Sequence, residues 1–311
     1  MDTVPSLFIE SVLQRSGKAV RSNALKLSRA WGRLAKAFWQ NGGTLELLYV
    51  PRERKGRFRY RLRGFALKSE VLSLEVAKDM SKTMSSISFH VYSFREDYAW
   101  KQVGPDQEDD VLELVKRLDA PTKELDFSPN QIDCYKDLVS NYSHVLRTFT
   151  SVKNVPNDPV LKPLLEDMIS TGRLQSIDFY GYEPAILPAS LLLDHFFNGN
   201  CRRLTLDVES ISVPELVNRW KQMDPQDAPH GKIIDLRGAD SDNFRGIKMD
   251  FLRLNHPRPA VFDRISKKFQ DLGTIETVQR IKHPETRYAK VHVVSLSVSD
   301  SDFHYYSMLF E

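Results

Sequence analysis

Apolar side chains recur at helical spacing through the first forty residues of the chain. The first set follows Pro5, a residue favoured in the opening turn of a helix, and consists of Phe8, Ile9, Val12 and Leu13. After a polar break, the second set consists of Leu25, Leu27, Trp31, Leu34 and Phe38, and Gly42-Gly43 ends it. The pattern predicts a short helical domain over residues 1–43.

The pattern changes to a period of two over residues 44–66. The runs TLELLYV and RFRYRLRG flank the polar stretch RERKG, and the second run alternates aromatic or aliphatic residues with arginines. Alternation of this kind on both sides of a polar turn predicts a β-hairpin at the entry to the following domain.

From residue 108 onward, amphipathic helical runs alternate with short apolar runs. The predicted strand centres lie 22 to 30 residues apart, at Phe127, Phe149, Phe179, Leu206 and Leu236. Proline near the start of a helical run (Asp158-Pro159, and Ser212 to Pro214) and glycine just after its end (Gly172) mark the helix boundaries. One helix and one strand per repeat is typical of an α/β solenoid that resembles leucine-rich repeats, and an irregular α/β sandwich is the alternative.

The repeat ends near Gly238, and residues 244–311 predict a C-terminal cap. FRGIKMDFLRLN predicts a strand, PAVFDRISKKFQDLG a helix, and TIETVQRIKH with AKVHVVSLSVS a β-hairpin. The hairpin would cover the open edge of the last solenoid strand. The final segment, DFHYYSMLF, would pack onto the body or offer an aromatic patch to a partner.

Composition is that of a folded, globular protein. The chain has 311 residues, of which 41% are hydrophobic and 27% charged, with a formal net charge of only +3. The near balance of charges makes a nucleic-acid partner unlikely. No run approaches 18 uninterrupted apolar residues, so no membrane span is expected. Charged residues interrupt the N-terminal apolar stretch, so no secretion signal is expected, and the two cysteines fit a cytoplasmic or nuclear protein.

Residue patterns that carry catalysis are missing from the sequence. Its eight histidines do not pair with one another or with cysteine at metal-ligand spacing, and it has no phosphate-binding glycine loop and no GxSxG turn. Cys201 is adjacent to two arginines, but its place at a strand entry favours a buried, inert thiol. We therefore expect no enzyme activity, no cofactor and no metal.

The N-terminal pattern resembles the F-box, a short helical domain that binds the Skp adaptor of cullin-RING ubiquitin ligases. The residues that carry the resemblance are Val4, Pro5, Phe8, Ile9, Val12, Leu13, Leu25, Leu27, Trp31 and Leu34. The layout of the whole chain is similar to the nematode families of F-box-like proteins, which begin with Met-Asp-x-Val-Pro and have a divergent C-terminal region.

The chain departs from the family pattern at the junction of the two helical runs. Ser16 stands where the family has an apolar residue, and Arg21 and Ser22 stand where it has a leucine pair. Such changes remove apolar area worth about 1.5–3 kcal/mol per fully buried side chain. The alternative is that the N-terminal helices only cap the solenoid, which makes the protein a stand-alone interaction module.

The resemblance implies an adaptor without catalytic activity. The Skp-family adaptor, and through it the cullin-RING ligase, would be bound by Val4, Pro5, Phe8, Ile9, Val12, Leu13 and Trp31. Residues 44–311 would present the strand-lined face of the solenoid to a protein substrate. Holding both on one rigid body raises the effective concentration of the substrate near the ligase.

A second candidate site is the arginine-rich run at residues 57–63. Its four arginines, on one face of a strand, would suit phosphate groups or an acidic partner, and they are Arg57, Arg59, Arg61 and Arg63. The alternative is a solvated edge strand that positive charge protects from pairing with other chains.

Overall fold

The structure is a computed structural model of the whole chain. It describes residues 4–15, 22–27, 29–50, 57–64, 84–91, 100–118, 120–127, 135–181, 185–252, 259–269, 272–297 and 304–311. The other ranges lie outside the described residues. They include Ser16 and Arg21 of the F-box-like pattern, the polar stretch at 51–56, and Cys134, one of the two cysteines. The chain divides into two compact units, residues 1–155 with 163–168, and residues 156–162 with 169–311. Both units are mixed α/β structures built on open sheets.

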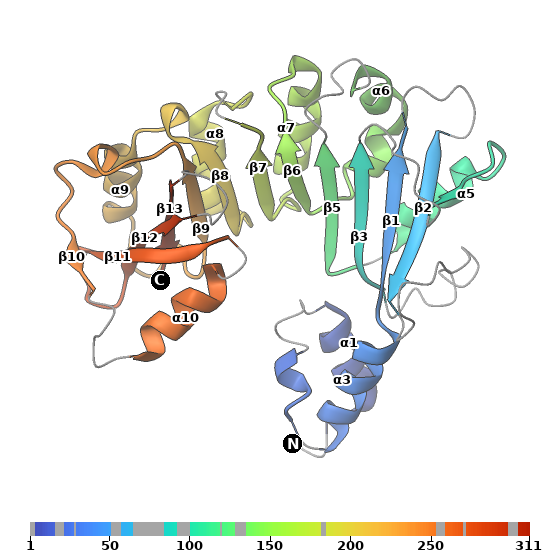
Figure 1. Cartoon of the computed structure of the whole chain (residues 1–311), viewed down its shortest axis with the longest axis horizontal. Helices are drawn as coiled ribbons and strands as arrows, with labels where there is room; N and C mark the ends of the chain where they lie inside the picture. The colour runs from blue at the N-terminus through green and yellow to red at the C-terminus, as the bar shows by residue number, and fades with distance from the viewer. Residues whose placement is uncertain are drawn as a thin grey trace. The chain divides into compact units, whose positions relative to one another are not determined.

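The first unit begins with two helices that pack beside each other (Figure 1). Its elements are α1 (Ser6–Arg15), α3 (Arg29–Asn41), β1 (Gly43–Tyr49), β2 (Phe58–Gly64), β3 (Met84–Val91), β4 (Lys101–Gln102), α5 (Glu108–Arg117), β5 (Thr122–Phe127), α6 (Tyr135–Leu146) and β6 (Ser151–Val155). The strands predicted for the entry hairpin are present as β1 and β2, which pair antiparallel with Glu46 opposite Arg61.

The sheet of the first unit has the order β6-β5-β3-β1-β2-β4. Strands β1, β3, β5 and β6 are parallel, and they join the sheet in chain order. Strand β2 lies between β1 and the two-residue strand β4. Helices follow the strands on one face, where Tyr142 of α6 meets the rings of Tyr49 and Phe58 at 5.9 and 5.1 Å.

The second unit contains three parallel strands followed by an antiparallel set. Its elements are η3 (Pro159–Leu161), α7 (Lys162–Ser170), β7 (Ser176–Phe179), α8 (Ala189–Asn198), β8 (Arg203–Asp207), η4 (Val208–Ser210), α9 (Val213–Lys221), β9 (Ile233–Arg237), η5 (Asp242–Phe244), β10 (Asp250–Phe251), α10 (Pro259–Phe269), β11 (Thr274–Lys282), β12 (Lys290–Ser297) and β13 (His304–Phe310). The middle of α7, residues 163–168, groups with the first unit.

The C-terminal strand β13 occupies a central position in the second sheet. The strand order is β10-β11-β12-β13-β9-β8-β7, so β13 lies between β12 and β9 and is antiparallel to both. The predicted hairpin exists as β11 and β12. However, it does not cover the edge of β9, because β13 pairs there instead. Residues 304–310 of the segment DFHYYSMLF therefore complete the sheet as β13, and its first two residues lie outside the described residues.

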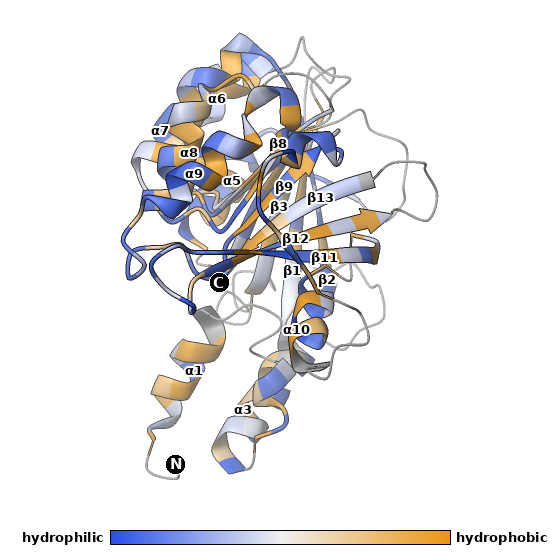
Figure 2. Cartoon of the chain, turned by 90° about the vertical axis from the view of Figure 1, so that its left-hand side faces the viewer, coloured by the Kyte–Doolittle hydropathy of each residue, from blue (hydrophilic) through white to orange (hydrophobic). Residues whose placement is uncertain are grey.

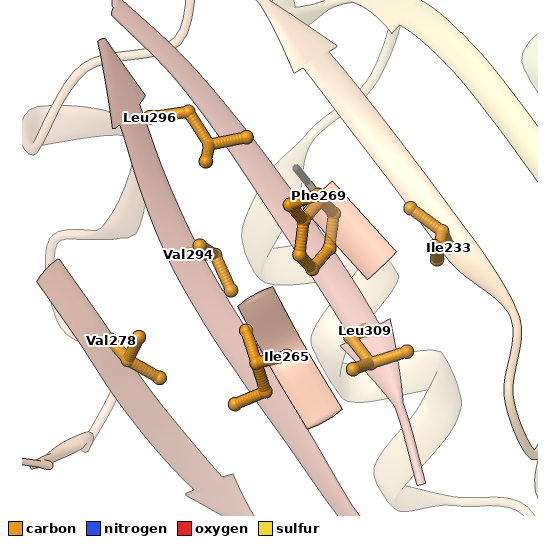
Figure 3. Packing of buried hydrophobic residues seen from close by; sticks show 7 residues of the cluster. All are labelled: Ile233, Ile265, Phe269, Val278, Val294, Leu296 and Leu309. Carbon is orange, nitrogen blue, oxygen red and sulfur yellow. The ribbon is translucent and has the colours of Figure 1, made fainter. Parts of the chain in front are cut away.

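Strand β13 is covered on both faces over its second half, where Ser307, Met308, Leu309 and Phe310 are all buried. On one face, Phe310 meets Phe196 and Phe197 of α8 at 5.3 and 5.9 Å, and Figure 2 shows α8 and α9 on this side of the strands. On the other face, α10 packs across four strands (Figure 3). That cluster consists of Ile233, Ile265, Phe269, Val278, Val294, Leu296 and Leu309.

Helix boundaries confirm the capping signals of the sequence. Asp158 accepts a hydrogen bond from the Val160 backbone N–H at 2.9 Å, and Ser212 accepts one from Glu215 at 3.4 Å. Gly172 follows α7 with φ of 66°, a left-handed conformation that glycine adopts without a steric penalty.

Two predicted strands are placed differently. Phe149 is not a strand centre, because α6 continues to Leu146 and β6 begins only at Ser151. Its burial comes instead from the corner between helix and strand, where its ring meets that of Phe89 at 5.9 Å. In the predicted strand 244–255, Phe244 instead belongs to a 3-10 helix and packs on Tyr306, and strand β10 consists of Asp250–Phe251. Residues 253–255 lie outside the described residues.

Candidate functional site

Helices α1 and α3 share a small hydrophobic core of their own. Its buried members are Ile9, Leu13, Ala24, Ala35 and Phe38, and Val4, Leu25, Ala30, Trp31 and Leu34 are partly buried around it. Pro5 directly precedes helix α1, and its carbonyl oxygen accepts hydrogen bonds from the N–H groups of Phe8 and Ile9. A separate core allows this helix pair to present a surface of its own.

Close approach within the helix pair depends on Gly32. A Cβ atom at this position would collide with the backbone carbonyl oxygen of Leu27. The absence of a side chain at Gly32 therefore lets the segment 22–27 pass directly against α3.

The residues predicted to contact an adaptor are divided between core and surface. Ile9 and Leu13 are fully buried, so in this arrangement they hold α1 against α3. Phe8 is 56% exposed, and Pro5 is exposed beside it. Val4, Val12 and Trp31 are of intermediate exposure.

Sequence reasoning missed Leu7, which is 79% exposed on the turn next to Phe8. Leu7 lies outside the apolar stripe formed by Ile9 and Leu13, so helical periodicity did not assign it to the core or to a binding surface. The available signal was the run Leu7-Phe8-Ile9, since three consecutive apolar residues cannot all face one core. Leu7, Phe8 and Leu27, which is 48% exposed, are the large apolar side chains that residues 4–50 expose within the described ranges.

A second surface is the face of the first sheet opposite α5 and α6. Strand register places polar residues in rows across β2, β1, β3 and β5, for example Arg61, Glu46, Ser88 and Glu124. We call this surface the polar strand face; it consists of Thr44, Glu46, Arg59, Arg61, Arg63, Ser86, Ser88, His90, Glu124, Asp126 and Lys153.

Hydrogen bonds and ion pairs link neighbouring strands along this face. His90 Nδ1 lies 3.2 Å from Asp126 Oδ2, and Asn154 donates to Asp126 Oδ1 at 2.7 Å. Burial alone would raise the pKa of Asp126, but the bonds from His90 and Asn154 outweigh it and lower that pKa. Lys153 Nζ lies 2.8 Å from Glu124 Oε2 and keeps 47% exposure. The surface is therefore polar and partly exposed, and side-chain contacts link its neighbouring strands.

The four arginines of the run 57–63 are not a free cationic strip. Arg61 Nε donates to Glu46 Oε2 at 2.8 Å, and Arg63 Nε lies 3.3 Å from Glu46 Oε1. The Arg61 guanidinium also lies over the Trp100 ring, 4.4 Å from its centroid. Arg57 precedes β2 and pairs with Asp137 at 3.2 Å, while Arg59 on β2 is of intermediate exposure. Because β4 pairs with β2, the run is not a bare edge strand either.

Buried reactive groups in the second unit have structural roles. Cys201 is fully buried, and burial raises the pKa of its thiol to about 12, which confirms the expectation of an inert cysteine. His195 Nε2 lies 2.8 Å from the Leu174 carbonyl oxygen. Among the described residues, no group of three or more His, Cys, Asp or Glu side chains could hold a metal ion. Within the same ranges, none of the helices has the length and apolar character needed to cross a membrane.

Comparisons with known proteins add no family to this description. No protein-family model matches the chain. A search of the curated proteins also found no match.

Proposed function

We propose that this protein is the substrate-recognition adaptor of a Skp-cullin-F-box ubiquitin ligase. The observation that carries the proposal is the exposed pair Leu7 and Phe8 beside Pro5, on a helix that already has a core of its own. An amphipathic helix needs only one apolar face for its own core, so a second one favours a protein partner.

The contact with the Skp adaptor is assigned to the outer face of α1. Burying Leu7 and Phe8 against a partner would contribute about 1.5–3 kcal/mol each at full burial. Ile9 and Leu13 would act indirectly, by fixing the angle of α1 against α3. The proposal assigns no bond-making step to this chain, whose role is to bring a protein substrate close to the ligase.

The proposed substrate platform is the α/β region from residue 44 onward. Parallel strands that join each sheet in chain order support an arrangement like that of leucine-rich repeats, and in the first unit the strands line the face opposite α6. The polar strand face would then meet the substrate, because its side chains are partly exposed and come from four or more adjacent strands.

Co-purification with the Skp adaptor tests the proposal. We expect the parent protein to bind and the Phe8→Ala variant to lose most of that binding. Phe251→Ala is the matched control, because it removes the same side chain from a site in the second unit that is 71% exposed. Thermal unfolding of each variant establishes that it is folded.

Absence of binding by the parent, or equal binding by Phe8→Ala and the parent, would overturn the adaptor role. The protein would then be a stand-alone interaction module whose N-terminal helices resemble an F-box without engaging the ligase. A phosphate or nucleic-acid role for Arg57–Arg63 is less favoured, because three of these arginines already form ion pairs, two with Glu46 and one with Asp137.

A further inference from the structure

The second unit contains a cavity of about 320 Å³ that the proposed adaptor role does not use. It lies where the loop before β9, helix α10 and the start of β12 meet. Its lining includes Pro225, Pro229, His230, Arg264, Tyr288, Ala289, Lys290 and Glu311. A volume of this size is at the lower end of the range for small-molecule sites.

Positive charge is in excess around this cavity. Arg264 Nη2 forms an ion pair with Glu311 Oε2 at 2.8 Å, and the arginine side chain is 51% exposed. Lys290 is half-buried, and its ammonium has no hydrogen-bond or ion-pair partner within the described ranges. Lys268 donates to the carbonyl oxygen of Gly231, next to His230, at 3.4 Å. Of these three cations, Arg264 and Lys290 line the cavity itself, and together they exceed the Glu311 side-chain carboxylate by one positive charge.

That carboxylate is fixed in place and is not available to move aside. Glu311 has a side chain only 6% exposed, and its Oε2 atom also lies 3.3 Å from Nδ1 of the buried His292. Burial raises the pKa of Glu311, but His292 and Arg264 outweigh this effect and lower it. The carboxylate is therefore ionised at neutral pH, and it orients Arg264 at the wall of the cavity.

The remaining walls suit a flat or apolar group. Pro225, Pro229 and Ala289 supply apolar surface, and Tyr288 is 74% exposed at the rim. The guanidinium of Arg287 lies over the Tyr288 ring, 5.2 Å from its centroid, and its Nη2 donates to the phenolic oxygen at 3.1 Å. These contacts hold the ring at the cavity entrance.

We propose that this cavity binds the phosphate monoester of a small organic molecule. Arg264 and Lys290 would hold the phosphate oxygens, because guanidinium and ammonium groups are the preferred partners of phosphate. Tyr288 and the two prolines would contact the organic part.

The proposal is tested by titrating the full chain with phenyl phosphate at low salt and measuring the dissociation constant by calorimetry and by ³¹P NMR. We expect the Lys290→Gln variant to weaken binding by about tenfold or more, since one charge-assisted contact is lost. Lys290→Gln leaves the Arg264–Glu311 pair intact, so it is the safest variant for folding. Lys248→Gln is the matched control, because Lys248 is exposed and lies outside the cavity.

Further ligands and one further variant identify what is recognised. Inorganic phosphate should bind more weakly than phenyl phosphate, and Tyr288→Ala should weaken only phenyl phosphate. Equal affinity for both ligands would indicate a site for free phosphate and overturn the monoester. Equal affinity for benzoate would overturn the choice of phosphate. Absence of binding at millimolar phenyl phosphate, or identical binding by Lys290→Gln and Lys248→Gln, would overturn the site altogether.

Discussion

Ser307 on β13 donates a hydrogen bond to Asp235 on β9, and the two oxygen atoms lie 2.5 Å apart. Both side chains are buried, and Asp235 also accepts from Arg203 Nε at 2.6 Å. The pair joins an antiparallel strand to the last parallel one, at positions directly opposite in the register. A buried carboxylate with several donors thus fixes how β13 enters the sheet.

Replacing Ser307 should destabilise the second unit. Ser307→Ala removes one donor from a buried carboxylate, so we expect the free energy of unfolding to fall by about 1–3 kcal/mol. Asp235→Ala should cost more, about 3–5 kcal/mol, because it leaves Arg203 without its partner. Chemical denaturation measures both, and Ser241→Ala at an exposed position is the control. A loss below about 0.5 kcal/mol for Asp235→Ala would contradict the role of this pair.

Phe269 should be among the most important residues of α10. It is fully buried between the helix and strands β9, β12 and β13, so Phe269→Ala should lower the free energy of unfolding by about 3–5 kcal/mol. Lys267→Ala, on the exposed side of the same helix, should change it by less than about 0.5 kcal/mol. Similar effects of the two substitutions would show that α10 does not pack as described.

Gly32→Ala should loosen the N-terminal helix pair. Alanine usually stabilises a helix by up to about 1 kcal/mol relative to glycine, so the expected sign here is opposite. The reason is the carbonyl oxygen of Leu27, which a Cβ atom would displace. Hydrogen exchange of the amides in α1 and α3 should become faster, while Arg33→Ala on the exposed face should leave it unchanged. Slower exchange in Gly32→Ala would refute the close approach.

Stability should fall as the pH drops from 7 to 5, in part because of His195. Burial lowers the pKa of His195 below its ordinary value of 6.5, so the folded protein binds this proton less readily than the unfolded chain. Its contribution is complete above pH 6.5 and is lost as the pH falls toward the folded pKa. His195→Gln should flatten this part of the pH profile of unfolding, whereas His144→Gln, at an exposed position, should not.

Cys201 should resist alkylation in the folded protein. Its thiol is buried with a pKa of about 12, so the reactive thiolate is scarce at neutral pH. A Cys134→Ser background leaves Cys201 as the single thiol of the chain. Mass spectrometry should find little iodoacetamide adduct before denaturation and complete modification after it. Rapid labelling of the folded protein would contradict the burial.

Local elements could be predicted because their signals lie close together in the chain. Asp158 with Pro159 and Ser212 with Pro214 mark helix starts within three residues, and the structure confirms both. Pairing of β13 with β9 could not be predicted, because Ser307 and Asp235 are 72 residues apart. Alternation of apolar residues predicts a strand but does not name its neighbour.

The candidate surfaces were predictable only in part, for the same physical reason. Helical period places Phe8 and Ile9 close together on α1, and only the packing of α3 decides that Ile9 is buried and Phe8 exposed. The alternation of arginines on β2 predicts one charged face, but their neutralisation depends on the register that sets Glu46 opposite Arg61. Both outcomes follow from contacts between separate elements, which one sequence does not specify.

The place of β13 also bears on how the protein is made. Residues 304–311 leave the ribosome after both of the strands that they separate, so β9 and β12 each wait with an unpaired edge during synthesis. Unpaired edges of apolar strands bind other unfolded chains. Biogenesis of the second unit should therefore depend on protection of these two edges, for example by a chaperone, until β13 pairs with them.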